Sequence, residues 1–173
     1  QELKVEKIWD EAPHNAFTDL VRWKDSFWCT FRESASHVPK NASENGKIRI
    51  LKSADGEKWE SAILLTSEKY DLRDPKLSIT PGNRLMITMG GSNYENGKLI
   101  DMMPLVSFTA DGKSFTLPVP AFIDDSIRTS YDWIWRVTWH RETGYGVVYQ
   151  SRIDGGAMRI RLLKTTDGIV YCL

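Results

Sequence analysis

This sequence of 173 residues contains few cysteines and histidines, carries no net charge and has no long apolar run. Its two cysteines, Cys29 and Cys172, are too few for a disulfide framework. The histidines His14, His37 and His140 lack the spacing of a zinc site, and we expect neither a metal nor another cofactor. The 23 basic and 23 acidic side chains cancel, which argues against a nucleic acid as partner. No apolar run reaches the roughly 20 residues of a membrane-spanning helix, so no membrane span is expected.

A seven-residue pattern, by contrast, occurs three times. It reads hydroxyl residue, any residue, Asp, Gly, two variable residues and an aromatic residue, at 53–59, 109–115 and 165–171. Its aspartates are spaced by 56 residues in both intervals, and a fixed period of this order is typical of repeat proteins. Asp and Ser/Thr side chains accept hydrogen bonds from nearby backbone N–H groups, and Gly adopts a positive φ without steric cost. Each copy therefore predicts a turn between two strands, with the closing aromatic ring packed under it.

The segments around these turns predict an all-β chain without helices. Strand-like segments recur within each period, and four antiparallel strands per repeat form one blade of a β-propeller. The predicted blades cover residues 16–66, 73–123 and about 132–173, the last without its outer strand. Residues 3–9 alternate apolar and charged side chains, which predicts an extra outer strand ahead of the first blade. The fold prediction is a β-propeller of four-stranded antiparallel blades, with three blades' worth in this chain.

Three blades do not close a ring, since propellers have roughly four to eight. In one interpretation the chain is half of a longer, six-bladed propeller. In the other, two copies pair as a homodimer about a two-fold axis, and residues 3–9 of each copy complete the third blade of its partner. That pairing would cover an otherwise exposed sheet edge. The sequence leaves both interpretations open.

The three turns resemble the Asp-boxes, also called BNR repeats, of the sialidase-like β-propeller family, in a shortened form. The resemblance covers the whole chain, and it is more specific for the type of blade than for an activity. It implies a secreted or periplasmic, carbohydrate-active protein with a glycan or sugar as ligand. The implied activity is that of a glycoside hydrolase acting at glycan termini. The alternative function is a non-catalytic propeller that binds carbohydrate or protein.

Antiparallel strands place successive connections at alternate ends of each blade, and hence on two faces of the propeller. The Asp-box turns fall on one face, so their aspartates are not expected to be catalytic. The longer loops fall on the opposite face, and we expect the ligand site there, near the propeller axis. These loops are residues 10–18, 32–46, 70–74, 90–101, 126–135 and 151–156.

The segment Tyr70-Asp71-Leu72-Arg73-Asp74-Pro75 concentrates two carboxylates and an arginine at the start of the second blade. Asp71 and Asp74 are the catalytic candidates, because a carboxylic acid can protonate a leaving group. Arg73 could bind a substrate carboxylate with two parallel hydrogen bonds. Arg73-Asp74-Pro75 is similar to the Arg-Ile-Pro strand start of sialidases, and five-bladed glycosidases also use an Asp there. The alternative interpretation is an Arg–Asp ion pair that fixes the start of the strand.

The other two blades supply further candidates for substrate binding. They are Arg32, Glu33 and His37 in the first blade and Trp133 and Arg136 in the third. Arginines would bind anionic groups, and an aromatic ring near the rim could stack on the C–H face of a sugar. A surface salt bridge at Arg32 and Glu33, and tryptophan packing between blades, are the alternatives. Sialidases use a Tyr nucleophile activated by Glu, and no such pair can be assigned here.

Overall fold

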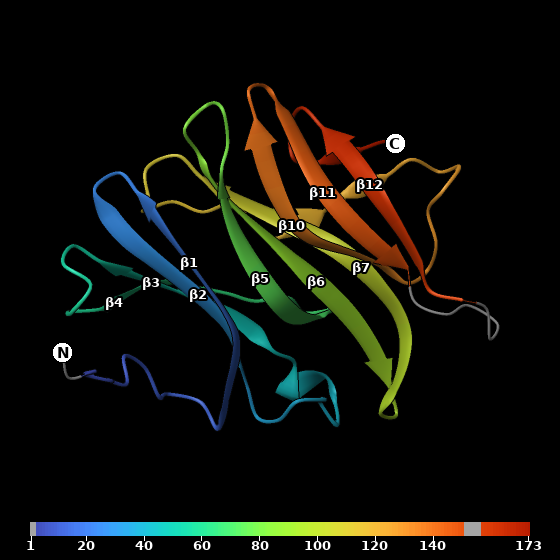
Figure 1. The fold of residues 1–173 in the computed structure, drawn as a ribbon. Helices are drawn as coiled ribbons and strands as arrows, with labels where there is room; N and C mark the ends of the chain where they lie inside the picture. The colour runs from blue at the N-terminus through green and yellow to red at the C-terminus, as the bar shows by residue number, and fades with distance from the viewer. Residues whose placement is uncertain (1–2, 151–156) are drawn as a thin grey trace.

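The computed structural model describes residues 3–150 and 157–173, and the predicted loop 151–156 lies outside them. The described chain consists mainly of strands (Figure 1). The strands are β1 (His14–Trp23), β2 (Ser26–Ser34), β3 (Lys47–Ser53), β4 (Glu60–Leu65), β5 (Asp71–Ile79), β6 (Leu85–Glu95), β7 (Lys98–Thr109), β8 (Val119–Pro120), β9 (Phe122–Ile123), β10 (Asp132–His140), β11 (Thr143–Gln150), β12 (Arg159–Thr165) and β13 (Val170–Tyr171). A short 3-10 helix, Ala42–Glu44, lies in the loop between β2 and β3. None of the helical structure in the described residues is long and apolar enough to cross a membrane.

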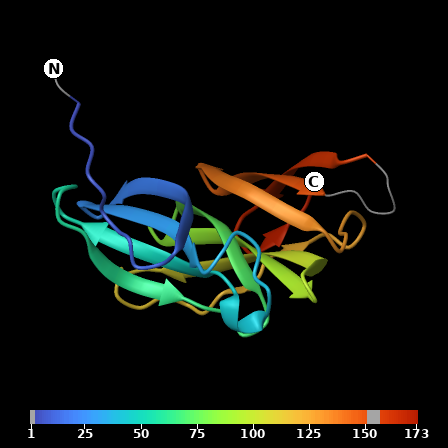
Figure 2. The same cartoon turned by 90° about the horizontal axis from the view of Figure 1, so that it is seen from below.

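The strands form three antiparallel sheets, ordered β1-β2-β3-β4, β5-β6-β7-β8 and β10-β11-β12, while β9 pairs with β13 in parallel. The sheets lie next to one another, with β5 between β1 and β10 (Figures 1 and 2). They are three blades of a β-propeller, as the sequence predicts, and β1, β5 and β10 are the inner strands. In the third blade the start of an outer strand is present, because Cys172 and Lys164 exchange backbone hydrogen bonds just after β13.

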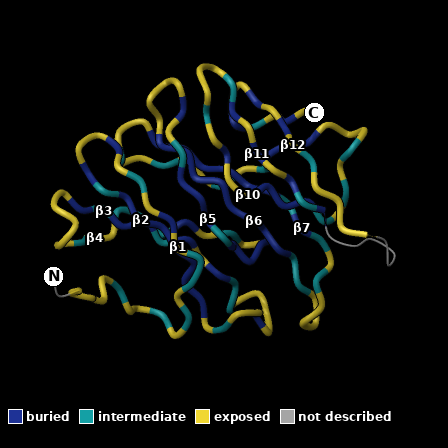
Figure 3. Tube along the Cα trace, viewed as in Figure 1, coloured by how far each residue is buried: buried dark blue, intermediate teal, exposed yellow. Residues whose placement is uncertain are grey.

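Two apolar cores join neighbouring blades, and they contain much of the buried chain in Figure 3. Between the first and second blades, Ile50 and Trp28 pack with Leu77. Between the second and third blades, Val106 packs with Val148. Burial of apolar surface stabilises these contacts, so it fixes the inner strands relative to one another.

The three Asp-box turns share one geometry. The Asp55 carboxylate accepts hydrogen bonds from the N–H groups of Glu57 and Lys58 at 2.8 and 2.9 Å, and Ser53 Oγ accepts one from Gly56 at 2.8 Å. The same contacts recur in the other two copies, and the three glycines have φ of 83°, 74° and 78°. The bonds from Lys58 and then Glu57 hold the pKa of Asp55 below its ordinary value. These carboxylates are therefore committed to the turns.

Residues 3–9, predicted as an outer strand, form no strand in the structure. A strand needs a neighbour with which to exchange backbone hydrogen bonds, and no ladder to this segment forms within the described chain. Its end is nevertheless anchored, because Trp9 packs beside Phe31 and Leu51 and donates a 2.5 Å hydrogen bond to Glu33. Pairing of this segment with a second copy stays a prediction.

Candidate functional site

Each inner strand carries a β-bulge, at residues 16–19 in β1, 73–76 in β5 and 134–137 in β10. A bulge inserts one extra residue and redirects the side chains around it. The first unpaired residues of the three bulges are Phe17, Asp74 and Trp135. Phe17 and Asp74 have positive φ, 64° and 46°, which is uncommon for residues other than glycine and occurs often at functional sites.

Contacts between blades show that the three bulges form one cluster. Asp19 of β1 accepts a hydrogen bond from the N–H group of Leu77 in β5 at 2.8 Å, and Arg136 of β10 donates to the same carboxylate. Lys76 Nζ of β5 lies 4.8 Å from the ring centroid of Trp135 in β10. Side chains from all three blades therefore meet where the inner strands run side by side.

Asp74 is the carboxylate of this cluster that has no cation within ion-pair distance among the described residues. Its side chain is half-buried, and the buried Oδ1 atom has no hydrogen-bond partner there. Burial raises the pKa of Asp74 above its ordinary value, against the opposing charges of Arg73 and Lys76. Burial, and then the negative charge of Asp74, raises the pKa of Tyr149 to about 12. A carboxyl group with a raised pKa is suited to general acid catalysis.

Asp71, the second catalytic candidate, is instead part of a buried ion pair. Its carboxylate, fully buried, accepts a 2.6 Å hydrogen bond from Arg32 Nη2, another from the N–H group of Gly46, and lies 3.4 Å from Arg73 Nε. Arg32 is equally buried and also donates to the Ser36 carbonyl oxygen. These contacts give Asp71 and Arg32 a structural role in the described chain, while their catalytic and substrate-binding roles stay predictions.

Glu33 and Trp133 are likewise occupied by contacts within the protein. Both oxygens of Glu33 accept hydrogen bonds from Arg49, at 2.8 and 3.0 Å. Trp133 is 5% exposed, stacks on Tyr149 with ring centroids 6.2 Å apart, and lies so close to Gly90 that a Cβ there would approach its ring to 2.4 Å. These contacts occupy much of both side chains, and substrate binding by either one stays a prediction. The contacts match the alternative interpretations, which are a salt bridge at Glu33 and packing of Trp133 between blades.

Arg73 and His37 do lie beside Asp74. Arg73 donates to the Tyr94 hydroxyl at 2.8 Å and to the His37 carbonyl oxygen at 2.5 Å, so its guanidinium orients the neighbouring loop. The exposed His37 ring lies 5.9 Å from that of Phe17. The positive charge of Arg73 lowers the pKa of His37, which favours a neutral imidazole able to donate and accept hydrogen bonds.

Arg136, the last candidate, is 42% exposed in its side chain and pairs with Asp19 at the edge of the cluster. Sequence reasoning included Phe17 and Trp135 only as members of the predicted loops 10–18 and 126–135, and it did not include Lys76. Comparison of the inner strands across the repeats would have indicated Phe17 and Trp135 as counterparts of Asp74. Lys76 had no such signal, because its burial depends on the bulge beside it.

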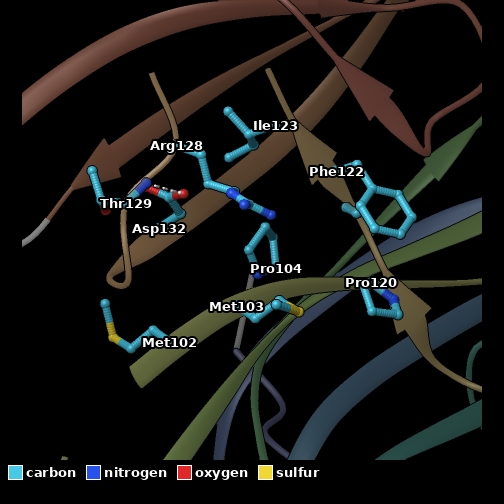
Figure 4. Close-up of a pocket in the computed structure, with 10 residues that line it drawn as sticks. Met102, Met103, Pro104, Pro120, Phe122, Ile123, Arg128, Thr129 and Asp132 are labelled. Carbon is cyan, nitrogen blue, oxygen red and sulfur yellow. Dashed lines mark hydrogen bonds between the residues drawn. The ribbon is translucent and has the colours of Figure 1, made fainter. Parts of the chain in front are cut away.

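A separate small cavity lies between the second and third blades (Figure 4). Its volume is about 80 Å³, about half the roughly 150 Å³ of an engineered cavity that holds one benzene ring. Asp132 lines it, but that carboxylate already accepts hydrogen bonds from Thr129 and Gln150. Nor do residues 3–150 and 157–173 contain a group of three or more His, Cys, Asp or Glu side chains placed to hold a metal.

No protein-family model and no curated protein sequence matches this chain. Solved structures do match it. A protein of unknown function from Dyadobacter fermentans is 18% identical, with a TM-score of 0.72, over 94% of this chain and 54% of that one. Zg3597, a family 117 glycoside hydrolase from Zobellia galactanivorans, is 10% identical, with a TM-score of 0.66, over 90% and 53%. An N-acetylgalactosamine deacetylase from F. plautii is 14% identical, with a TM-score of 0.60, over 91% and 51%. These identities establish the fold alone, and the chain spans about half the length of these structures.

Proposed function

We propose that these three blades belong to a carbohydrate-active propeller that binds the end of a glycan at the bulge cluster. In this proposal Asp74 is the acid/base group of a glycoside hydrolase. The observation that carries it is the half-buried Asp74 carboxylate, with its raised pKa and unpartnered Oδ1, set among the bulges that carry Phe17 and Trp135. Aromatic residues suit the apolar faces of sugars, and two of the matched structures are named as enzymes of carbohydrate chemistry.

Anion binding by three arginines, the sialidase arrangement, has weak support. Arg32 and Arg73 are already occupied by Asp71 and by neighbouring oxygens. Of the three predicted arginines, Arg136 alone keeps a substantially exposed side chain. The proposal is therefore a glycoside hydrolase on a sialidase-like fold, without a commitment to sialic acid.

Hydrolysis with two carboxyl groups needs a second one at about 5–10 Å from the first. The bulge positions equivalent to Asp74 carry aromatic rings in the other two blades, and Asp19 and Asp71 are bound to arginines. The second carboxyl group would therefore come from blades that complete the ring. This need favours the second candidate function, a sugar-binding propeller in which Asp74 accepts hydrogen bonds from hydroxyl groups.

Hydrolysis of a panel of aryl glycosides, including a fluorogenic sialoside, tests the proposal with an Asp74→Asn variant. Loss of a general acid should lower the rate by about 10²-fold or more. Asp125→Asn is the control, because that side chain is 86% exposed, and its rate should equal that of the unmodified chain. Full activity of Asp74→Asn would overturn the catalytic role.

Binding measured on the same panel separates the remaining candidates. Glycan binding without hydrolysis, weakened by Asp74→Asn, would establish the sugar-binding alternative. Neither binding nor hydrolysis would leave a protein-binding or structural module.

A further inference from the structure

Lys76 is the buried cation of the cluster that has no counterion. It is 6% exposed, and among the described residues its ammonium group makes no hydrogen bond and has no carboxylate oxygen within 4.0 Å. The buried Arg32 and Arg73 contact Asp71, and the half-exposed Arg136 contacts Asp19. The Lys76 ammonium lies over the aromatic ring of Trp135.

A buried charge is costly unless an opposite charge or hydrogen bonds compensate for it. Contact with the face of a tryptophan ring supplies only part of that compensation. Burial lowers the pKa of Lys76, while the more distant Asp19 and Asp74 act in the opposite direction and Arg136 adds to the lowering. A negative group brought to the ammonium would gain both a charge partner and a hydrogen-bond donor.

We propose that Lys76, with Arg136 beside it, binds an anionic group carried by the glycan, either a carboxylate or a sulfate ester. This inference rests on the proposed function, because it assumes that a sugar lies beside Asp74. Asp74 and Lys76 belong to the same bulge of β5, and the charge of each acts on the pKa of the other, so both side chains can contact one bound sugar ring. Lys76 is then the residue that selects acidic over neutral sugars.

Calorimetric titration of the 173-residue chain with matched sugars tests this selection. The probes are galactose, galacturonate and galactose 6-sulfate, and glucose with glucuronate. An acidic sugar should bind about tenfold or more tightly than its neutral counterpart, as expected for a hydrogen bond between charged groups. Which acidic galactose binds better distinguishes the carboxylate from the sulfate ester.

Lys76→Met should abolish the preference, so that acidic and neutral sugars bind to this variant with equal affinity. Lys52→Met is the matched control, because Lys52 Nζ also lies over a tryptophan ring, 5.5 Å from that of Trp28, in another part of the molecule. It should retain the preference. Methionine is similar in volume and removes a buried charge, so Lys76→Met should unfold at a temperature no lower than the unmodified chain.

Equal affinity for acidic and neutral sugars would overturn the role of Lys76 while the proposed function stands. A marked loss of stability in Lys76→Met would assign the lysine a structural role instead. A direct measurement on the chain without substitutions avoids dependence on that variant or on the choice of sugar. After ¹³C-methylation of lysines, the Lys76 NMR signal should move on addition of galacturonate or inorganic sulfate, and a signal that both leave in place refutes the inference. Absence of any sugar binding or hydrolysis would refute the proposed function itself.

Discussion

Asp71 and Asp74 lie three positions apart at the start of one strand, yet their surroundings give them different roles. Asp71 is fully buried against Arg32 and accepts a backbone hydrogen bond from Gly46. Asp74 follows in the bulge, half-buried and without a cation within ion-pair distance among the described residues. The same side chain is thus a structural anchor in one position and a candidate reactive group in the other.

Removal of the Asp71 carboxylate should destabilise the protein strongly. Asp71→Ala leaves the buried Arg32 guanidinium without its counterion, and breaking a buried pair in this way costs roughly 3–5 kcal/mol. Unfolding in urea measures the change, with the exposed Asp125→Ala expected within about 0.5 kcal/mol of the unmodified chain. A loss below about 1 kcal/mol for Asp71→Ala would show that the pair contributes little.

The sequence indicates the candidate segment more readily than the contacts of its side chains. The charged segment 70–75 and its place at the start of an inner strand could be read directly. The partner of Asp71 could not, because Arg32 lies 39 residues away and reaches it only after the blades pack. The roles of Glu33 and Lys76 likewise depend on strand register and on a bulge, neither of which leaves a periodic signal.

Elements defined by local hydrogen bonds were predicted well. The Asp-box turns depend on contacts within seven residues. Their spacing was therefore enough to predict three successive sheets along the chain. The outer strand of the second blade was harder to predict, since the blade predicted over 73–123 implies one regular strand at its end. Pro118 and Pro120 lack the N–H groups that a ladder requires, and two short strands, β8 and β9, form there.

Gly112 of the second Asp-box should tolerate a side chain less well than Gly97. Both have a positive φ, 74° and 73°, so alanine strains the backbone similarly at each. A Cβ at Gly112 would lie 2.6 Å from the ring of Trp28, whereas one at Gly97 meets no atom within 4 Å. Gly112→Ala should therefore unfold with about 1–3 kcal/mol less stability than Gly97→Ala. Equal melting curves would show that Trp28 shifts at no cost.

At the scale of the whole molecule, equivalent faces of the three blades differ in exposure. Ile50 and Val106 occupy matching positions in the third strands of the first two blades, and both are fully buried by the next blade. Leu162, their counterpart in the third blade, is 59% exposed, and Ile160 on the same face is 71% exposed. The chain thus presents on its third blade the surface that each earlier blade buries.

The glycines of the Asp-boxes show what such a face contacts. The box glycine of the second blade lies under Trp28 of the first, and that of the third lies under Met86 of the second. Tyr145 is the corresponding residue of the third blade and is partly exposed. Gly56 is the box glycine of the first blade, and its nearest neighbour there is the ring of Phe27 at 3.7 Å. Tyr145 of the third blade and Gly56 of the first blade are therefore the residues that would meet if a third contact of this kind formed.

We expect the 173-residue chain on its own to complete this contact with a second copy, the third blade of each packing on the first blade of the other. Sedimentation equilibrium should then give twice the chain mass of 19.8 kDa.

Ile160→Glu combined with Leu162→Glu should return the mass to that of one chain, because two charges cannot be buried there without partners. Leu117→Glu, at an exposed position of the second blade, should leave the association intact. The double substitution should barely change the melting temperature of the separated chains, since both side chains are already exposed in one copy. A single-chain mass for the unmodified protein at high concentration would mean that this face is covered by other blades and not by a second copy.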